Sequence, residues 1–201
     1  MGRASAAKKL TAIPEPTPVP DVPLRLDFGC GPHKREGFIG IDKTAFVGVD
    51  VVMDVASEPW PWADGSVAEA HASHFLEHLN ALQRCHFLNE LYRVLVPGGT
   101  CLVIVPAWSS SRAYGDPTHQ WPPIGPFTFY YYSKAWRLAN APHADASVLP
   151  GGYDCDFEAT WGFSQRPDLA VRNDEYKAFA CANYLDAIQD YYITLRALKA
   201  T

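Results

Sequence analysis

A glycine turn directly after a short apolar segment constrains this chain more than any other feature. Residues 24–28 alternate apolar and polar side chains, which predicts a strand, and Gly29-Cys30-Gly31 follows at once. Glycine has no Cβ, so the backbone of such a turn can approach a ligand closely. Ligands of open α/β sheets bind beyond the carboxyl ends of the strands. We therefore expect this turn to border a ligand site.

The segments up to residue 106 alternate between strand-like and helix-like patterns. We predict further strands at 37–42, 49–55, 67–73 and 100–105, and a helix at 81–95 that Pro97-Gly98-Gly99 ends. Leu82, Leu88, Leu91 and Leu95 are assigned to the apolar stripe of this helix. This order predicts the α/β class: a Rossmann-like, doubly wound, mostly parallel sheet in a single domain, covered on both faces.

The rest of the chain is less regular. We expect a loop at 106–126, a helix at 127–138, a loop at 140–152 and strands at 153–163 and 191–198. Residues 1–22 carry prolines at every second position from 14 to 20, which predicts an extended, disordered tail. The domain at 23–201 then divides into a cofactor half, about 23–106, and a substrate-capping half, about 107–201.

Charge and cysteine content limit the classes of partner. The 201 residues carry a net charge of −5, which disfavours nucleic acid while leaving a local basic groove open. The five cysteines are scattered without a C-x-x-C pair, as expected for reduced thiols. No apolar run approaches the roughly 18 residues of a membrane span. We expect a soluble, cytoplasmic protein without a membrane partner.

Acidic residues end three successive predicted strands: Asp27, Asp42 and Asp54. The Asp42 carboxylate can accept both hydroxyl hydrogens of a ribose. Asp54 can accept from an adenine amino group, with Val55 and the Trp60-Pro61-Trp62 segment as apolar walls. Asp42 comes only eleven residues after Gly31, which argues against the NAD fingerprint and its spacing of about 20 residues. The alternative is that each acid caps a turn.

Five motifs, in order and spacing, resemble the class I S-adenosylmethionine-dependent methyltransferases, particularly the short ones. They are Leu26-Asp27-Phe28-Gly29-Cys30-Gly31-Pro32, Gly40-Ile41-Asp42, Asp50 to Asp54 before the Trp-Pro-Trp segment, Ser73-His74-Phe75-Leu76-Glu77-His78, and Arg93-Val94-Leu95-Val96-Pro97-Gly98-Gly99. The resemblance implies S-adenosylmethionine as cofactor, with Gly29 and Gly31 at its methionine part, Asp42 at the ribose and Asp54 at the adenine. The expected cofactor contacts are Asp27, Gly29, Cys30, Gly31, Asp42, Lys43, Asp54, Val55, Ser73 and His74.

The chain departs from this pattern between its first two strands. Only residues 32–37 separate them, whereas a parallel crossover normally needs about a dozen residues or more. Either the first helix shrinks to a turn or the second strand is shorter than predicted. Lys34 and Arg35 in this segment either neutralise the cofactor carboxylate or remain solvated charges.

A second motif competes with this interpretation. His74-Phe75-Leu76-Glu77-His78 matches the inverted zinc-peptidase motif, in which two histidines one helical turn apart bind a metal and the glutamate acts as base. The segment follows a predicted strand instead of lying inside a long helix, and no third ligand is evident. We therefore expect no metal and keep a zinc hydrolase as an alternative, beside a cofactor-binding protein without catalysis.

Candidate catalytic residues follow the strand at 100–105. Residues 114–121 combine a turn, aromatic side chains and His119, which has the right intrinsic pKa for a general base and which Asp116 can orient. His74 is the third candidate, and the alternative is an Asx turn with a surface histidine. The aromatic run at 127–132, with Trp136, either lines a pocket or packs in the core. If the resemblance holds, we expect the acceptor to be a small or nucleotide-like molecule that is methylated on oxygen or nitrogen and is otherwise unidentified.

Overall fold

A seven-stranded sheet organises the chain. The computed structural model describes residues 22–200, so the tail expected at 1–22 lies outside the described residues except for residue 22. The strand order is β3-β2-β1-β4-β5-β7-β6. The strands are β1 (Leu24–Phe28), β2 (Ile39–Asp42), β3 (Val51–Val52), β4 (Val67–Ser73), β5 (Leu95–Pro106), β6 (Phe157–Gln165) and β7 (Ile188–Ala197).

The pairing of the strands confirms the predicted fold class. Strands β1 to β5 pair in parallel, and β7 lies antiparallel between β5 and β6. From β1 the next strands, β2 and β3, are added on one side, and from β4 the later strands are added on the other side. The order therefore reverses between the neighbouring strands β1 and β4. In doubly wound folds, ligands bind in the crevice at such a switch point. The glycine turn after β1 and His74 after β4 both lie there.

The helices are shorter and more numerous than predicted. The segment predicted as one helix at 127–138 forms two helices instead, since the helical conformation is interrupted after Tyr130. The Ser133 hydroxyl caps the second helix by accepting a hydrogen bond from the Trp136 amide. A helix within 164–190 was not predicted at all. The elements are η1 (Leu76–His78), α1 (Ala81–Val94), α2 (Arg112–Gly115), α3 (Pro126–Tyr130), α4 (Lys134–Asn140), η2 (Pro142–Ala144), η3 (Pro167–Leu169) and α5 (Asp174–Asn183).

The unusually short connection between β1 and β2 contains no helix. Both predicted resolutions hold together: β2 begins only at Ile39, and the segment before it is a series of turns. The Arg35 amide donates to the Asp27 carboxylate at 2.7 Å, which fastens this segment to β1. Strand β3 shrinks likewise, to two residues of the predicted seven.

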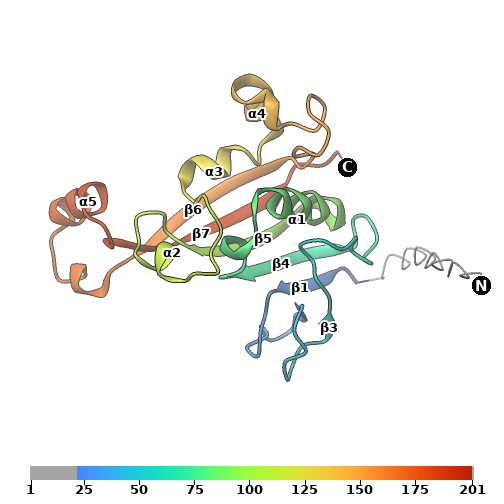
Figure 1. The fold of residues 1–201 in the computed structure, drawn as a ribbon, viewed down its shortest axis with the longest axis horizontal. Helices are drawn as coiled ribbons and strands as arrows, with labels where there is room; N and C mark the ends of the chain where they lie inside the picture. Colours follow the sequence, from blue (N-terminus) through green and yellow to red (C-terminus); the bar gives the residue numbers. More distant parts are fainter. Residues whose placement is uncertain (1–21, 201) are drawn as a thin grey trace, which may run out of the picture.

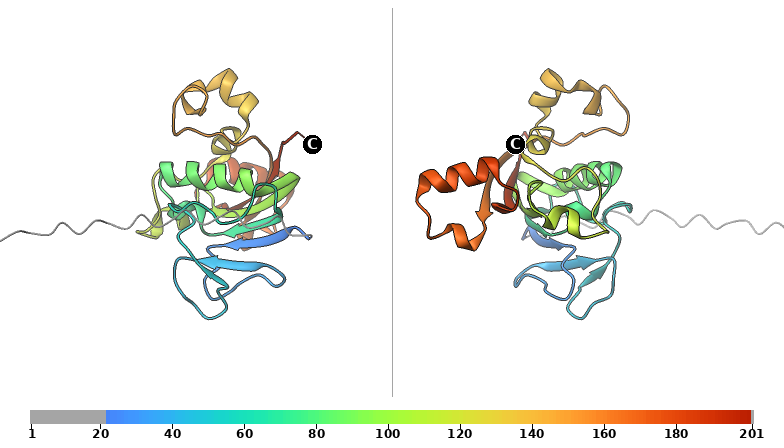
Figure 2. Two further views of the ribbon diagram at one scale, coloured as in Figure 1. Left: turned by 90° about the vertical axis from the view of Figure 1, so that its right-hand side faces the viewer. Right: turned by 60° about the vertical axis from the view of Figure 1, so that its left-hand side comes forward.

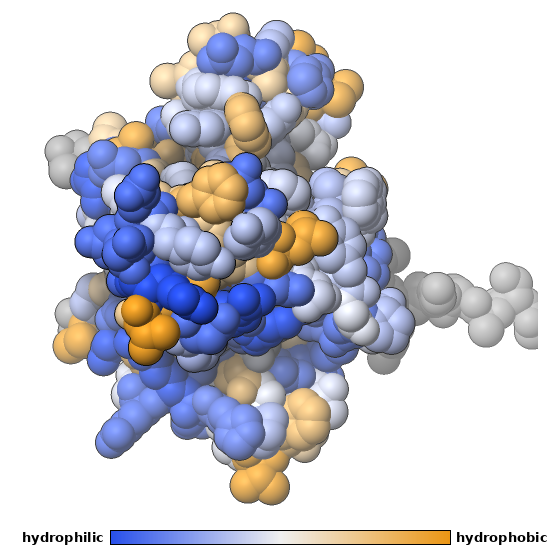
Figure 3. All heavy atoms as spheres, turned by 90° about the vertical axis from the view of Figure 1, so that its left-hand side faces the viewer, coloured by the Kyte–Doolittle hydropathy of each residue, from blue (hydrophilic) through white to orange (hydrophobic). Residues whose placement is uncertain are grey.

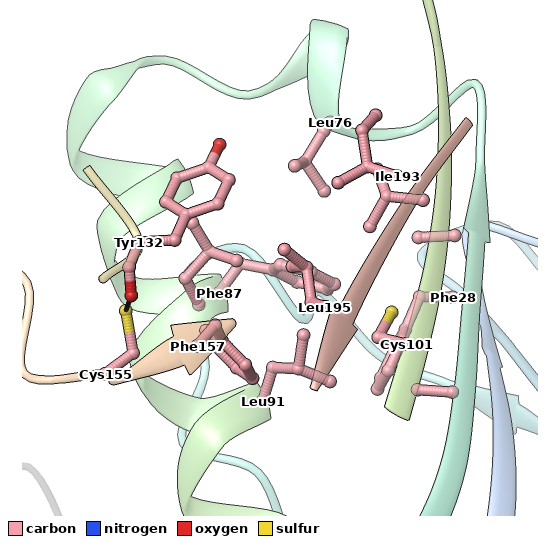
Figure 4. Close-up of a cluster of buried hydrophobic side chains, with 14 of the residues drawn as sticks. Phe28, Leu76, Phe87, Leu91, Cys101, Tyr132, Cys155, Phe157, Ile193 and Leu195 are labelled. Atoms are coloured by element: carbon pink, nitrogen blue, oxygen red, sulfur yellow. Dashed lines mark hydrogen bonds between the residues drawn. The ribbon is translucent and has the colours of Figure 1, made fainter. Parts of the chain in front are cut away.

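Helix α1 covers one face of the sheet with an apolar stripe. Phe87, Leu88 and Leu91 are fully buried. Figure 4 shows Phe87 and Leu91 directed toward β1, β5 and β7. The assignment of Leu82 to this stripe was wrong, since its side chain is 77% exposed. An α-helix turns by about 100° per residue, so the side chains of Leu82 and Leu88, six residues apart, point about 120° away from each other around the helix axis.

Helices α1, α3 and α4 lie on the same side of the sheet (Figures 1 and 2). The expected cover on both faces does not hold at β7, where Tyr192, Thr194 and Arg196 are exposed and alternate with buried residues. Charged side chains pair across neighbouring strands here, as in Arg196–Glu158 at 2.7 Å. Among the described residues, no helix is long and apolar enough to cross a membrane.

Candidate functional site

The glycine turn after β1 takes the conformation that its sequence predicts. Gly29 and Gly31 have φ angles of +62° and +52°, in the left-handed region that favours glycine. A Cβ on Gly29 would collide with the Phe75 ring, whereas a Cβ on Gly31 would meet nothing within 4 Å. The turn therefore packs against Phe75 at one glycine and is open at the other.

Asp42 at the end of β2 holds this turn in place. Its Oδ2 accepts from the Gly31 amide at 3.0 Å, and its Oδ1 accepts from the Thr44 amide at 2.8 Å. A carboxylate has about four lone-pair sites, so each oxygen retains capacity for one more hydrogen bond. Asp42 can thus position the backbone and still bind a ligand hydroxyl.

A cleft of about 700 Å³ opens at this edge of the sheet. Its lining includes six of the predicted cofactor contacts: Gly29, Asp42, Lys43, Asp54, Val55 and His74. Figure 3 looks onto the end of the molecule toward which β4 points, where mostly hydrophilic side chains surround a few apolar ones. The remaining lining residues are Thr44, Phe46, Met53, Ala56, Phe75, His78, Leu79, Gln83, Thr118 and Gln120.

Four predicted contacts, Asp27, Cys30, Gly31 and Ser73, are outside this lining. The Asp27 carboxylate is buried and is bonded to the Arg35 amide and to His71 Nδ1, each at 2.7 Å. It therefore links β1 to the following turn and to β4. Contacts of these four residues with a cofactor stay predictions.

The Cys30 thiol is protonated at neutral pH. Burial, with the nearby carboxylates of Asp27 and Asp42, raises its pKa to about 11. Its Sγ donates to the Gly31 carbonyl at 3.4 Å. This cysteine is consequently a packing residue of the turn and not a thiolate nucleophile.

Asp54 caps a turn, as the alternative interpretation held, and its contact with an adenine stays a prediction. Its carboxylate accepts from the Ala56 amide at 3.1 Å and from the Ser57 hydroxyl at 2.7 Å, which is a turn-capping pattern. It also lines the cleft. Trp60 and Trp62 instead pack in the core near Phe28. The predicted Val55 does line the cleft, together with Phe46, Met53 and Leu79, which sequence reasoning missed.

Lys34 and Arg35 do not line the cleft. The Lys34 ammonium pairs with Asp50 at 2.8 Å, and the Arg35 guanidinium lies 5.1 Å from the centre of the Phe38 ring. Asp50 also accepts from the Gly40 amide at 2.8 Å. These charges stabilise the β1–β2 connection, so the interpretation as cofactor ligands is not supported.

A second cavity of about 580 Å³ adjoins the cleft, and His74 and His78 line both. It brings together two segments far apart in sequence, the one around η1 and the one after α2. The candidate catalytic residues His74, Asp116 and His119 all lie in its wall. The other lining residues are Glu77, Pro106, Arg112, Gly115 and Pro117.

A buried arginine connects these two segments. Arg84 on α1 donates to the carbonyls of Leu76, Gln120 and Pro122, at 3.1, 3.3 and 2.9 Å. The Gln120 amide also donates to the Glu77 carbonyl at 2.8 Å. Nothing in the local sequence around Arg84 indicates this role, because its partners are backbone carbonyls and two of them, those of Gln120 and Pro122, belong to a loop more than 35 residues away.

His119 is oriented by the backbone more than by Asp116. Its Nδ1 lies 3.2 Å from the Ala113 carbonyl, while its Nε2 lies 3.8 Å from Asp116 Oδ2. Asp116 accepts from the Thr118 amide at 2.8 Å and so forms the Asx turn that was the alternative interpretation. His119 itself is only 11% exposed and faces the cavity.

His74 has a backbone conformation that is unusual for a residue with a side chain. Its φ is +51°, and such strain is concentrated at functional sites. The helix that the His-x-x-Glu-His motif requires is absent here, because only Leu76–His78 form a 3₁₀ turn and His74 precedes it. A hydrogen bond from Nδ1 to Glu77 Oε1, at 3.2 Å, raises the pKa of His74. Ligand atoms of Glu77, His78 and His119 lie within 4.8 Å of one another.

The aromatic run at 127–132 packs in the core only in part, since Phe127 and Tyr130 are 76% and 47% exposed. Phe129 and Tyr132 are buried in the main core. Tyr130 stacks on Trp136 with ring centres 5.7 Å apart, and both line a separate hollow of about 330 Å³. No residue of that hollow lines the cleft or the second cavity.

Comparison with solved structures supports the same fold. A SAM-dependent methyltransferase from Archaeoglobus fulgidus is 21% identical, with a TM-score of 0.55 over 88% of this chain and 86% of that one. A SAM-dependent methyltransferase from Methanosarcina mazei is 14% identical, with a TM-score of 0.52 over 90% and 95%. No protein-family model and no curated protein sequence matches the chain. The fold is the Rossmann-like fold of the class I methyltransferases.

Proposed function

We propose that this protein binds S-adenosylmethionine in the cleft at the carboxyl edge and transfers its methyl group to a small or nucleotide-like acceptor. The observation that carries the proposal is the position of Asp42. Its carboxylate joins the left-handed glycine turn to the end of β2 and lines a cleft of about 700 Å³ at the switch point of the sheet. The likeness to methyltransferase structures supports this choice among the ligands that such a crevice can hold.

The cleft residues fit the chemical groups of this cofactor. The remaining lone pairs of Asp42 suit the ribose hydroxyls, and Asp54 beside Met53 and Phe46 suits a purine with an amino group. Gly29 of the glycine turn lines the cleft, and we assign the amino-acid part of the cofactor to this end of it. When bound, the cofactor supplies a methyl group activated by a sulfonium charge.

The acceptor side is the second cavity, which His74 and His78 connect to the cleft. We assign His119 as the group that removes a proton from an oxygen or nitrogen acceptor, because its imidazole faces the cavity and its Nδ1 is held by the Ala113 carbonyl. Asp116 lies beside this ring, with its Oδ2 3.8 Å from His119 Nε2. The main contribution of the cavity is alignment of the two reactants.

Formation of S-adenosylhomocysteine tests this activity. The purified protein is incubated with S-adenosylmethionine and chromatographic fractions of a small-molecule cell extract, and S-adenosylhomocysteine is quantified by mass spectrometry. We expect at least one fraction to raise product formation above the level without extract. Tight cofactor binding with no product from any fraction would instead support the non-catalytic alternative.

Replacement of the proposed base gives the first mutational prediction. His119→Ala should lower product formation at least tenfold, since positioned general bases contribute about 10²–10⁴ in rate, and should leave S-adenosylmethionine affinity unchanged. The matched control is His143→Ala, which alters an exposed histidine in η2. Unchanged turnover in His119→Ala would remove this assignment.

A further inference from the structure

Three side chains with metal-binding atoms meet in the second cavity, from two separate segments. A carboxylate oxygen of Glu77 and a ring nitrogen from each of His78 and His119 lie within 4.8 Å of one another. Ligands at bonding distance from one tetrahedral zinc ion are about 3.4 Å apart. The separations of the three atoms therefore exceed the spacing around a bound zinc ion by at most about 1.4 Å.

One oxygen of the Glu77 carboxylate is buried without a hydrogen-bond partner in the part of the chain that the structure describes. The residue is only 5% exposed, and its Oε2 has no hydrogen-bond partner among the described residues. Oε1 is 3.2 Å from His74 Nδ1, while the neighbouring Arg84 directs its guanidinium hydrogens to backbone carbonyls. A buried carboxylate oxygen without a partner is costly, and a cation beside it removes that cost.

The hydrogen bonds of His78 direct its free lone pair to Nε2. The Thr118 hydroxyl lies 2.7 Å from Asp116 Oδ1, and an ionised carboxylate can only accept, so the hydroxyl hydrogen points there. The same Thr118 oxygen lies 2.9 Å from His78 Nδ1 and therefore accepts a hydrogen bond from the N–H group of that nitrogen. A neutral His78 then carries its hydrogen on Nδ1 and presents the Nε2 lone pair.

His119 is prepared in the same way by a different partner. The Ala113 carbonyl, 3.2 Å from Nδ1, can only accept, so the hydrogen of a neutral ring is on Nδ1 and the lone pair on Nε2. The rings of His78 and His119 are 4.7 Å apart, nearly perpendicular. Metal-binding imidazoles are typically oriented by such a partner on the far nitrogen.

We propose that Glu77, His78 and His119 bind one divalent first-row transition-metal ion. Two imidazoles and one carboxylate suit zinc or iron better than magnesium or calcium. The proposed site departs from the metal-free expectation from the sequence. It also differs from the inverted zinc-peptidase motif, because His119 takes the place of His74 and Glu77 is a ligand instead of the base.

The place of the site indicates what the ion does. Three protein ligands leave at least one coordination position open, and the cavity adjoins the cofactor cleft through His74 and His78. This part of the inference rests on the proposed function: the open coordination position would hold an oxygen of the methyl acceptor. The acceptor class is then a hydroxyl compound that can bind a metal. With the ion bound, the Nε2 lone pair of His119 would be occupied, and the ion would take over from the unligated His119 the role of assisting the loss of the acceptor proton.

Zinc titration tests the site without any need for cofactor or acceptor. Tag-free protein, stripped with a chelator and dialysed, is titrated with zinc chloride by isothermal calorimetry. We expect one saturable site, with affinity lowered on the order of a hundredfold or more in His78→Ala and His119→Ala, since each loses one of three ligands. The exposed-histidine control His143→Ala should bind as the parent does, and magnesium chloride should give no binding at the same concentrations.

A milder variant keeps the test sharp if a ligand variant folds poorly. Thr118→Val preserves shape but removes the oxygen on His78 Nδ1, and should lower zinc affinity about 10- to 100-fold. The proposal is overturned if no saturable zinc site exists, or if the two ligand variants and Thr118→Val all bind as tightly as the parent. Protein that binds S-adenosylmethionine but no zinc refutes only this site, and protein that binds zinc but no S-adenosylmethionine refutes only the proposed function.

Discussion

Two glycines of one turn share a backbone conformation but differ in their surroundings. Gly29 is packed against the Phe75 ring, so any side chain there meets both backbone strain and a steric clash. Gly31 has the same kind of positive φ but faces open space, so a side chain there meets strain alone. The first glycine is required by the protein's own packing, and the second is free to serve a ligand.

This difference gives a paired prediction. Gly31→Ala should cost about 1–3 kcal/mol in unfolding free energy, the range for a residue held in an unfavourable backbone region, and Gly29→Ala should cost clearly more. Urea denaturation followed by circular dichroism compares the two. Equal losses would show that Phe75 does not confine Gly29.

Only some of the residues that line the cleft could be predicted from the sequence alone. Gly29, Asp42 and Asp54 were predictable because they follow strands at one sheet edge, and this placement depends only on local pattern. Phe46 and Gln120 were not, because each reaches the cleft from a loop whose path is set by remote contacts. The Gln120 loop, for example, is held by a backbone hydrogen bond to Glu77.

Among the elements, helix α1 connects the core to both parts of the site. Its apolar stripe packs on the sheet, while Arg84 holds the loops that form the second cavity. At the other end of the helix, Glu90 and Arg93 bind the segment between β3 and β4 through the backbone of Trp60 and Trp62. Periodicity predicts such a helix, but not which loops its polar side chains hold.

Loss of the Arg84 contacts should loosen the second cavity more than the cleft. Arg84→Met keeps an apolar stem but removes three charge-assisted hydrogen bonds, each worth about 1.5–3 kcal/mol when intact. We expect faster hydrogen exchange in residues 117–123 and a large loss of unfolding free energy. Unchanged exchange in this loop would contradict the role given to Arg84. Arg172→Met, which alters an exposed arginine outside the lining of the second cavity, is the control.

The Glu90 carboxylate should make stability depend on pH. Burial by itself raises its pKa, but hydrogen bonds from Arg93 and the Trp60 amide outweigh this, and the pKa lies below its ordinary value of 4.5. A lowered folded-state pKa stabilises the protein above the ordinary value, and this contribution is lost as the pH falls through the folded-state value.

Glu90→Gln should therefore destabilise the protein at pH 7 by about 1.5–3 kcal/mol, the range for hydrogen bonds to a charged group. The difference from the parent should shrink as the pH falls below 4.5. Urea titrations at several pH values measure it. A difference that stayed constant down to acid pH would show that the carboxylate charge is not involved.

For the whole molecule, the sheet order places the chemistry between its two halves. The parallel strands up to β5 carry the motifs that the sequence made recognisable, and the antiparallel β7 and β6 complete the sheet. Figure 1 shows α2 and α5 at the end of the molecule toward which β4 points, so the capping half meets the carboxyl edge there. The pairing of β7 between β5 and β6 was not predictable, because strand order in space depends on long-range contacts.

The short connections have a consequence at the same scale. No helix joins β1 to β2 or β2 to β3, so ion pairs such as Lys34–Asp50 and aspartate-to-amide bonds hold these strands. The cleft is therefore built largely on turns that are ordered by carboxylates. Asp42 is the carboxylate common to the turn and the cleft, and the account depends on it.

Isothermal calorimetry with S-adenosylmethionine and S-adenosylhomocysteine tests this claim most directly. The parent protein should bind each at a single site, and Asp42→Asn should weaken both at least about tenfold, because hydrogen bonds to a charged group contribute about 1.5–3 kcal/mol. Asp174→Ala, which removes a fully exposed carboxylate, is the control and should bind as the parent does. No measurable affinity for either compound, or equal affinity in Asp42→Asn, would contradict the account.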